Sequence, residues 1–333
     1  MNAPATESES GPESRLAGLR FSDLYLEPDD QAWFKLAPDD RERHVVGGAL
    51  LEEAHELRHH LQEHRTGLDF RVDWDGLRLR VQRIETVDGD VYVCRRLLDH
   101  PLAFADLKFP QKLADVLLGE DLARGGLILF TGPTGAGKSM SQASWLAARL
   151  AKFGGTACTV ENPVEVPLHG RHGSGSVVGT CYQTEVHDDA EFGPSIRRIL
   201  RAAPNMMLIG EIRGHDAAAQ AVLAGSSGHL VSSTLHANDV QAALERLKTM
   251  LVESSLDVNF MADALAVVLH QTMITSRVGG EPKRRVVVSP LVISGAANEV
   301  AIRSTLRKGD FSLLASEMRR QDSLCRSAEG GRL

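Results

Sequence analysis

The hydrophobic pattern divides the chain into two regions. Over residues 16–99, short apolar segments alternate with polar positions, and one stretch carries leucines and alanines at helical spacing. This mixture is typical of a small α+β domain. Its expected elements are strands at 23–27 and 31–36, a helix at 49–64, and an alternating stretch over 69–85 that leads into a turn at 88–90.

After residues 100–112, the pattern changes to continuous apolar runs that alternate with helical periodicity. Such runs indicate strands buried on both faces, so this region is predicted to be an α/β domain with a parallel sheet. The expected strands are 127–130, 156–160, 206–209 and 230–234, the expected helices are 140–152, 216–224, 240–251 and 259–270, and a hairpin follows over 272–276 and 284–292.

These patterns predict five segments. They are a disordered N-terminus at 1–15, rich in Glu, Ser, Pro and Gly, then the α+β domain at 16–99, a linker at 100–112, the α/β domain at 113–294 and a helical C-terminal tail at 295–333.

Composition narrows the class of protein. Apolar residues make up 43% and charged residues 24% of the chain, as in soluble globular proteins. The net charge of −7 argues against nucleic acid as the main partner, because nucleic-acid binders carry basic surfaces. Four cysteines without a Cys-x-x-Cys pair favour reduced thiols in the cytoplasm over a zinc site or disulfides. With no signal peptide and no apolar run of about 20 residues, we expect membrane contact only through a partner.

A phosphate-binding motif lies between an apolar strand and a helix. Residues 132–139, Gly-Pro-Thr-Gly-Ala-Gly-Lys-Ser, match GxxxxGK[ST]. In such a loop the backbone N–H groups surround the phosphates, Lys138 reaches the β- and γ-phosphates, and the Ser139 hydroxyl ligates Mg²⁺. A chance glycine-rich turn is the alternative, and the flanking strand and helix argue against it. We therefore expect nucleotide binding by Gly132, Pro133, Thr134, Gly135, Ala136, Gly137, Lys138, Ser139 and Met140.

Acidic residues follow two further apolar strands. Glu165 comes after the strand at 156–160, and Glu211 comes after the strand at 206–209. The carboxyl ends of parallel strands surround the ligand crevice, so we expect one carboxylate to support Mg²⁺ and one to position or deprotonate the attacking water. Taken singly, either glutamate could be a solvated loop charge.

Two histidines stand at the ends of the strand at 230–234. A lone histidine is usually structural, whereas one at the carboxyl end of this strand could contact the γ-phosphate. We therefore expect His236, rather than His229, to lie near the phosphates.

The order of these motifs resembles a known family. The phosphate loop, Thr-Val-Glu-Asn-Pro-Val-Glu at 159–165, Leu-Ile-Gly-Glu-Ile-Arg-Gly at 208–214 and the stretch from Gly228 to Val240 are similar to the Walker A, Asp box, Walker B and His box of the secretion ATPases of type II secretion, type IV pili and type IV secretion. The resemblance covers roughly residues 100–310. Residues 183–187, Gln-Thr-Glu-Val-His, also resemble this family.

The resemblance implies an α/β, RecA-like P-loop ATPase domain preceded by a small α+β PAS-like domain. It implies ATP and Mg²⁺, with Glu165 as the catalytic glutamate, Glu211 as the Walker B glutamate supporting Mg²⁺, and His229 and His236 as a pair that couples nucleotide state to domain motion. The small domain of a neighbouring subunit would supply arginines to the nucleotide. Among Arg80, Arg83, Arg95 and Arg96, we select Arg80 and Arg95.

The resemblance also implies a cytoplasmic motor, a homo-oligomer that is expected to be a hexamer, associated with the inner membrane through a platform protein. The short chain and the tail motif at 301–307 are similar to the PilT-like or DotB-like branch, in pilus dynamics, secretion or plasmid conjugation. Two alternatives stay open: a nucleic-acid-translocating RecA-like ATPase and a non-catalytic ATP-binding assembly protein. Asn162 and Asn205 stand where the family usually has aspartates, which favours the second alternative, and Tyr25 and Thr272 are further departures.

Overall fold

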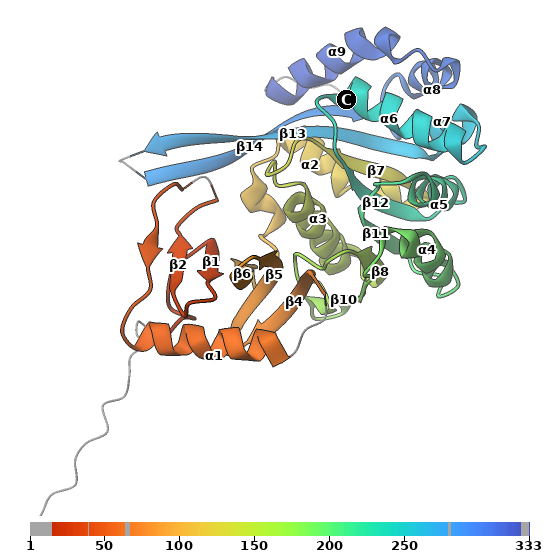
Figure 1. Cartoon of the computed structure of the whole chain (residues 1–333). Coiled ribbons are helices and arrows are strands. Elements are labelled where there is room, and N and C mark those ends of the chain that lie inside the picture. The colour runs from red at the N-terminus through yellow and green to blue at the C-terminus, as the bar shows by residue number, and fades with distance from the viewer. Residues whose placement is uncertain (1–14, 39, 64–66, 279–280, 328–332) are drawn as a thin grey trace, which may run out of the picture. The chain divides into compact units, whose positions relative to one another are not determined.

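The computed structural model describes residues 15–38, 40–63, 67–278, 281–327 and 333. Its contacts divide the chain into two compact units, Met1–Asp99 and His100–Leu333, which are described separately below (Figure 1). The expected disorder at 1–15 falls almost entirely outside the described residues. Among the described residues, no helix combines the length and apolar character needed to cross a bilayer.

The first unit is an antiparallel sheet with one long helix. The strand order is β3-β2-β1-β6-β5-β4, and α1 packs its leucines against the inner face of the sheet. The buried Arg58 of α1 donates hydrogen bonds to the carbonyl oxygens of Leu26 (3.2 Å) and Asp90 (3.0 Å), which fixes the helix to two strands. The elements are β1 (Asp23–Leu26), β2 (Ala32–Lys35), β3 (His44–Val45), α1 (Ala49–Glu63), β4 (Asp69–Trp74), β5 (Leu77–Thr86) and β6 (Gly89–Arg96).

The second unit is built on an eight-stranded sheet of order β14-β13-β7-β12-β11-β8-β10-β9. The six inner strands are parallel, and β9 and β14 pair antiparallel at the two edges. The strands are β7 (Gly126–Thr131), β8 (Gly155–Glu161), β9 (Gly170–Ser174), β10 (Val177–Glu185), β11 (Met206–Glu211), β12 (Leu230–Leu235), β13 (Leu265–Val278) and β14 (Glu281–Val292). Every residue of β7 and β12 is buried, as expected for strands covered by helices on both faces.

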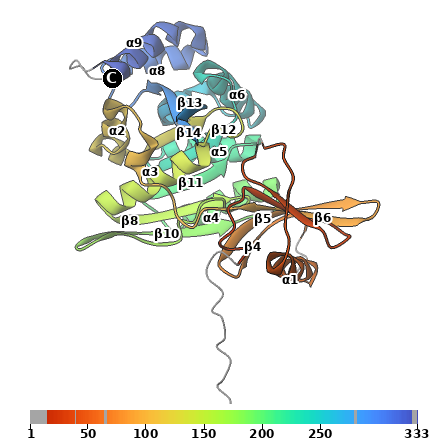
Figure 2. The same ribbon diagram turned by 90° about the vertical axis from the view of Figure 1, so that its left-hand side faces the viewer.

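Helices cover both faces of this sheet. The chain crosses from β7 to β8 in one direction and returns through β11 to β12, so right-handed crossovers place α3 on one face and α4 and α5 on the other. In Figure 2, β8 and β10 run side by side beneath α3. The helices are α2 (Gln111–Leu117), α3 (Lys138–Phe153), α4 (Phe192–Leu200), α5 (His215–Ser226), α6 (Val240–Glu253), α7 (Val258–Ala264), α8 (Glu299–Lys308) and α9 (Ala315–Arg326), with short 3-10 turns at Phe104–Leu107, Glu120–Arg124, Asp189–Glu191 and Phe311–Leu314.

Two elements differ from the sequence-based expectation. The helix predicted at 259–270 ends at Ala264, and the chain continues directly into β13. Residues 265–269 are fully buried between β7 and β14, and periodicity cannot distinguish such an apolar run from a buried helix. The hairpin of β9 and β10 was not anticipated, because its glycine- and serine-rich residues at 170–179 resemble a loop.

Candidate active site

The sheet gathers the predicted motifs at its carboxyl edge. Strands β7, β8, β11 and β12 run parallel, so the phosphate loop after Thr131, the loop after Glu161, and residues Glu211 and His236 all lie at the edge where ligands bind in open α/β sheets. The common strand direction therefore brings the phosphate loop and the ends of the Asp box and the Walker B motif to one edge of the sheet. Of the His box, His236 lies at this edge.

The phosphate loop is held against β13. Gly132 has φ +146°, and a Cβ there would lie 2.2 Å from the carbonyl oxygen of Gln271, so only glycine fits. The side-chain amide of Gln271 is fully buried and donates a 2.7 Å hydrogen bond to the carbonyl oxygen of Ala136. Gln271 thus supports the loop from beneath, while residues 133–135 stay exposed at its tip.

Lys138 begins α3, whose positive dipole end faces the loop. Its ammonium group donates hydrogen bonds to the carbonyl oxygens of Gly132 (2.9 Å) and Pro133 (3.0 Å). Burial lowers the pKa of Lys138, and the charges of Glu211 and Glu165 oppose that shift. The two predicted glutamates therefore lie close enough to act electrostatically on the loop lysine.

His236 bridges Lys138 and Glu211. Its Nδ1 lies 3.5 Å from the Lys138 Nζ, and its Nε2 lies 3.2 Å from the Glu211 Oε1. An ammonium group only donates and a carboxylate only accepts, so a neutral imidazole with its proton on Nε2 satisfies both neighbours. Burial and the Lys138 charge lower the pKa of His236, which favours this neutral form, and Glu211 raises it.

The other oxygen of Glu211 accepts a hydrogen bond from Arg213. Arg213 Nε lies 2.8 Å from Glu211 Oε2, and its Nη1 lies 3.2 Å from Asp189 Oδ1. Arg213 belongs to the Walker B motif, but the sequence reasoning assigned it no role. The structure shows that both oxygens of Glu211 have partners in this conformation.

A cavity of about 50 Å³ opens between the loop after β8 and the ends of β11 and α3. Its volume is sufficient for a few water molecules. Among the residues lining it are Ser139, Glu161, Asn162, Glu165, Glu211 and Arg213. Hydroxyl and carboxylate oxygens are the ligands that Mg²⁺ prefers, so Ser139 and Glu211 fit the predicted metal site.

Glu161 is a site residue that the sequence reasoning missed. It is the last residue of β8, and one of its carboxylate oxygens accepts hydrogen bonds from the Thr159 hydroxyl (2.6 Å) and the Gln183 amide (2.9 Å). Burial raises the pKa of Glu161 to about 7, although those two hydrogen bonds lower it. Its position at the end of an apolar strand was the available signal.

Met140 and His229 are not among the residues that line this cavity. The Met140 sulfur accepts a hydrogen bond from the Leu102 backbone N–H (3.3 Å). His229 precedes β12, so it lies at the amino edge of the sheet, a strand length of about 20 Å from His236. Its Nδ1 lies 3.3 Å from the Ser227 hydroxyl. The structure therefore does not bring His229 to the phosphate loop, because the two histidines flank opposite ends of one strand.

Asn205 also belongs to the amino edge. Its side-chain oxygen accepts hydrogen bonds from the backbone N–H (2.9 Å) and hydroxyl (3.3 Å) of Thr156, at the start of β8. This departure from the family pattern therefore concerns how β8 is held. Only Asn162 of the two asparagines lines the cavity.

The selected arginines share one row on the outer face of the first unit's sheet. Arg80 and Arg95 lie directly opposite each other on β5 and β6, and the antiparallel register extends this row to Arg71, Asp23 and Lys35. Arg80 forms a two-point ion pair with Asp69 (3.1 and 2.7 Å), and Arg95 Nε lies 2.8 Å from Asp23. The row thus holds four cations, and the carboxylates of Asp69 and Asp23 offset the charges of Arg80 and Arg95.

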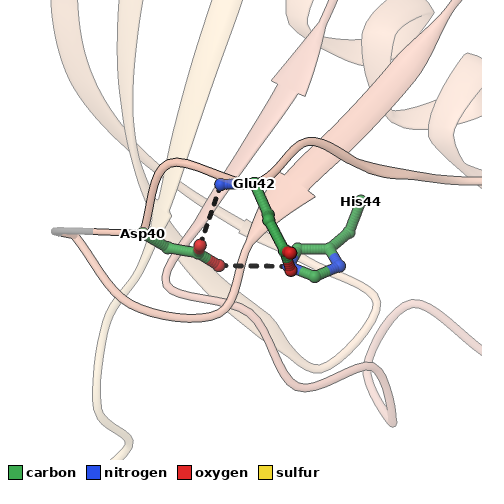
Figure 3. A group of neighbouring side chains, drawn as sticks. All are labelled: Asp40, Glu42 and His44. Atoms are coloured by element: carbon green, nitrogen blue, oxygen red, sulfur yellow. Dashed lines mark hydrogen bonds and ion pairs between the residues drawn. The ribbon is translucent and has the colours of Figure 1, made fainter.

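A further group of potential metal ligands lies in the first unit (Figure 3). Asp40 accepts hydrogen bonds from the backbone N–H groups of Glu42 (3.0 Å) and Leu36 (3.1 Å), and its Oδ2 lies 3.1 Å from His44 Nε2. These backbone bonds lower the pKa of Asp40. The carboxylate thus fixes the turn between β2 and β3, which accounts for the cluster.

Comparison with known proteins places the chain among secretion ATPases. Residues 59–305 match the family described as type II/IV secretion system protein. The chain is 32% identical over 272 residues to the protein transport protein HofB homolog of Escherichia coli K12, covering 77% of this chain and 56% of that protein. It is 36% identical over 210 residues to type II secretion system protein E of Pectobacterium carotovorum, and the match covers 61% of this chain and 39% of that protein. The chain thus spans about half the length of these relatives or less.

Two solved structures share the fold. The ATPase DotB of Legionella pneumophila superimposes with a TM-score of 0.70 at 18% identity, covering 96% of this chain and 90% of that one. The pilus retraction motor PilT, solved with bound ADP, superimposes with a TM-score of 0.71 at 23% identity, covering 94% of this chain and 90% of that one. These similarities confirm the α/β, RecA-like ATPase fold. Since residues 59–305 match the family model and the motifs occur in the expected order, the chain belongs to the type II/IV secretion system protein family.

Proposed function

We propose that this protein is an ATP-hydrolysing motor subunit that works in a hexameric ring, in type IV pilus dynamics or in type II or type IV secretion, including plasmid conjugation. The observation that carries the proposal is the cluster of Lys138, His236 and Glu211 beside a cavity that Ser139 and Glu165 line. A buried lysine, an imidazole and two carboxylates at the carboxyl edge of a RecA-like sheet suit phosphoryl transfer to water.

Each side chain has a task in this chemistry. The ammonium group of Lys138 moves from the loop carbonyls to the β- and γ-phosphate oxygens, and Glu165 orients or deprotonates the attacking water. Ser139 and Glu211 would hold Mg²⁺, the latter directly or through water. Bound Mg²⁺ neutralises charge that develops on the phosphates. His236 is placed to report the loss of the γ-phosphate, because it contacts both Lys138 and Glu211.

The arginine row supports assembly. Arg80 and Arg95 belong to the PAS-like first unit, and we propose that this unit presents them to the nucleotide of a neighbouring subunit. An arginine supplied in trans contributes about 10³–10⁵ to the rate in other nucleotide hydrolases. Association with an inner-membrane platform protein, from the cytoplasmic side, belongs to the same proposal.

Asn162 favours the non-catalytic alternative, because it removes one negative charge from the cavity. Asn205 gives that alternative no support, since it holds the opposite edge of the sheet. The retained Glu165 and Glu211 favour hydrolysis.

The test is Mg²⁺-dependent ATP hydrolysis by the full chain, resolved by oligomer size. We expect activity in a ring-sized species, its abolition by Lys138→Ala, and its loss in Glu165→Gln. Full turnover in Lys138→Ala would disprove the active-site assignment, and ATP binding without turnover in a well-formed ring would favour the non-catalytic alternative.

Mixing variants tests the shared site within the same assay. Lys138→Ala subunits keep the arginine row, and Arg80→Ala subunits keep the phosphate loop. We expect each variant alone to be inactive and the mixture to recover part of the activity. Arg80 is the cleaner choice, since Asp69, with which it pairs, is partly exposed, whereas Asp23 beside Arg95 is buried. No recovery would argue that the arginine does not act in trans.

A further inference from the structure

The motif at 183–187 takes no part in the proposed chemistry, yet it lies beside the loop that carries Glu165. Its first three residues form the end of β10, which pairs in parallel with β8, so that Gln183 lies opposite Thr159 and Glu185 lies opposite Glu161. The Asp-box loop, defined here as residues 162–169, leaves β8 next to this strand end. Its side chains are therefore within reach of the loop.

The side-chain amide of Gln183 uses its full hydrogen-bonding capacity. An amide offers two N–H donors and an oxygen with two lone pairs. The Gln183 oxygen accepts from the backbone N–H groups of Leu168 (2.5 Å) and His169 (2.8 Å). The nitrogen donates to the Glu161 carboxylate (2.9 Å) and to the carbonyl oxygen of Val166 (3.0 Å). All four bonds go to the Asp-box loop or to the acid that precedes it.

Glu185 adds a further attachment. Its carboxylate accepts a 2.9 Å hydrogen bond from the backbone N–H of Val164. The loop is therefore held at residues 164, 166, 168 and 169, on both sides of Glu165. Such a pattern fixes the backbone position of Glu165 while leaving its side chain at the cavity.

We propose that Gln183 is a positioning residue for ATP hydrolysis, which holds the Asp-box loop through its amide oxygen and directs the Glu161 carboxylate at the cavity through its amide nitrogen. This inference rests on the proposed function, since it assumes that Glu165 activates water. Glu161 then acts beside Glu165 as a second carboxylate that orders water or accepts its proton.

The charges around Glu161 explain why a donor is needed there. Burial raises the pKa of Glu161 most, and the charges of Glu165 and Glu185 raise it further. Cys181 lies nearby on β10, and Glu211 and Arg213 line the same cavity. The N–H group of Gln183 is one of two hydrogen-bond donors to Glu161 in the described structure. It stabilises the ionised carboxylate of Glu161, whereas the neighbouring negative charges disfavour that form. Its loss favours the protonated acid.

Two substitutions separate the two halves of the amide. Gln183→Glu keeps an acceptor for Leu168 and His169 but removes the donor to Glu161 and adds a negative charge. Gln183→Met removes both functions at similar size. Thr184→Ala is the matched control, because Thr184 neighbours Gln183 on β10 and makes no side-chain hydrogen bond within the described part of the chain.

The first measurement is steady-state ATP hydrolysis by the full-length ring over pH 5.5 to 9. We expect kcat to fall about 10²-fold in Gln183→Met with KM for ATP within about threefold, since misplacement by about 1 Å has effects of this size. The rising limb of kcat against pH should move to higher pH in Gln183→Met, and furthest in Gln183→Glu. Thr184→Ala should match wild type.

The second measurement is backbone amide hydrogen exchange of peptides covering 162–169, which does not require turnover. Exchange at 168–169 should rise in Gln183→Met and stay near wild type in Gln183→Glu. The two measurements thus rank the variants in opposite orders, which a general loss of folding cannot do. Unchanged exchange in Gln183→Met would overturn the proposal whether or not the wild type hydrolyses ATP.

If the wild type hydrolyses ATP and both variants keep its kcat and pH profile, the inference fails while the proposed function stands. If the wild type binds ATP but does not turn it over, the proposed function fails, and so does the catalytic part of this inference.

Discussion

At the carboxyl edge of the eight-stranded sheet, His236 lies between a lysine and a glutamate, whereas at the amino edge the His229 ring lies within hydrogen-bond distance of a serine hydroxyl. The asparagines differ in the same way. Asn162 lines a cavity with three carboxylates, and Asn205 satisfies the backbone of a neighbouring strand. Identical residue types therefore belong to the candidate site at one edge and serve strand attachment at the other.

The cause is the geometry of parallel strands. At the carboxyl edge, loops diverge after each strand and leave side chains facing a shared opening. At the amino edge, backbone groups of the next strand take up the polar side chains, as Thr156 does with Asn205. The backbone of His229 is used similarly, since its N–H donates to Ala224 (3.1 Å) and its carbonyl oxygen accepts from Gly126 (2.9 Å).

The largest expected difference between the edges concerns the two histidines. His236→Ala should lower kcat for ATP hydrolysis about 10²–10³-fold, comparable to the loss of one preorganised polar group at a catalytic centre. His229→Ala should stay within about threefold, as substitutions away from such features usually change the free energy by about 0.5 kcal/mol. The measurement is kcat at saturating ATP in rings of equal size. Equal losses in both variants would contradict the division between the edges.

The next largest effect concerns the stability linked to Glu161. Its pKa is raised from 4.5 to about 7 by burial, so the folded state binds the proton more tightly than the unfolded state. The stability that this tighter proton binding contributes to the folded state is fully present below pH 4.5 and is lost as pH rises through about 7. Glu161→Gln removes the charge, so the variant should unfold at a higher temperature than wild type at pH 8.5. The corresponding gain in the free energy of unfolding should be up to roughly 3 kcal/mol.

Near pH 5 the thermal midpoints of Glu161→Gln and wild type should converge, because Glu161 is then protonated in the folded state. Calorimetry of both proteins across this range checks the sign. A midpoint difference that does not depend on pH would show that Glu161 does not carry the buried charge.

Much of this site was predictable from the sequence because motif spacing and strand direction are local properties. An apolar run before the phosphate loop gives β7, and the acids after β8 and β11 follow the same rule. The misassigned helix at 265–270 marks the limit, since full burial removes the periodicity that separates helix from strand.

The residues that sequence reasoning missed act through long-range contacts. Gln271 reaches the phosphate loop from β13, and Gln183 reaches Glu161 from β10. Neither glutamine carries a charge or belongs to a motif with an assigned chemistry. Their roles come from the strand order, in which β13 lies beside β7 and β10 lies beside β8.

The smallest expected effect separates the asparagines. Asn205→Ala removes the acceptor for the Thr156 N–H and should lower the free energy of unfolding by about 1 kcal/mol, the typical net value of one hydrogen bond. Its kcat should be unchanged, because Asn205 lies at the amino edge. Asn162→Asp instead adds a negative charge beside Glu161, which should raise the pKa of Glu161 and move the rising limb of kcat to higher pH. A pH profile that shifts in Asn205→Ala, or that stays fixed in Asn162→Asp, would mean that the chemistry does not depend on which end of a strand a residue follows.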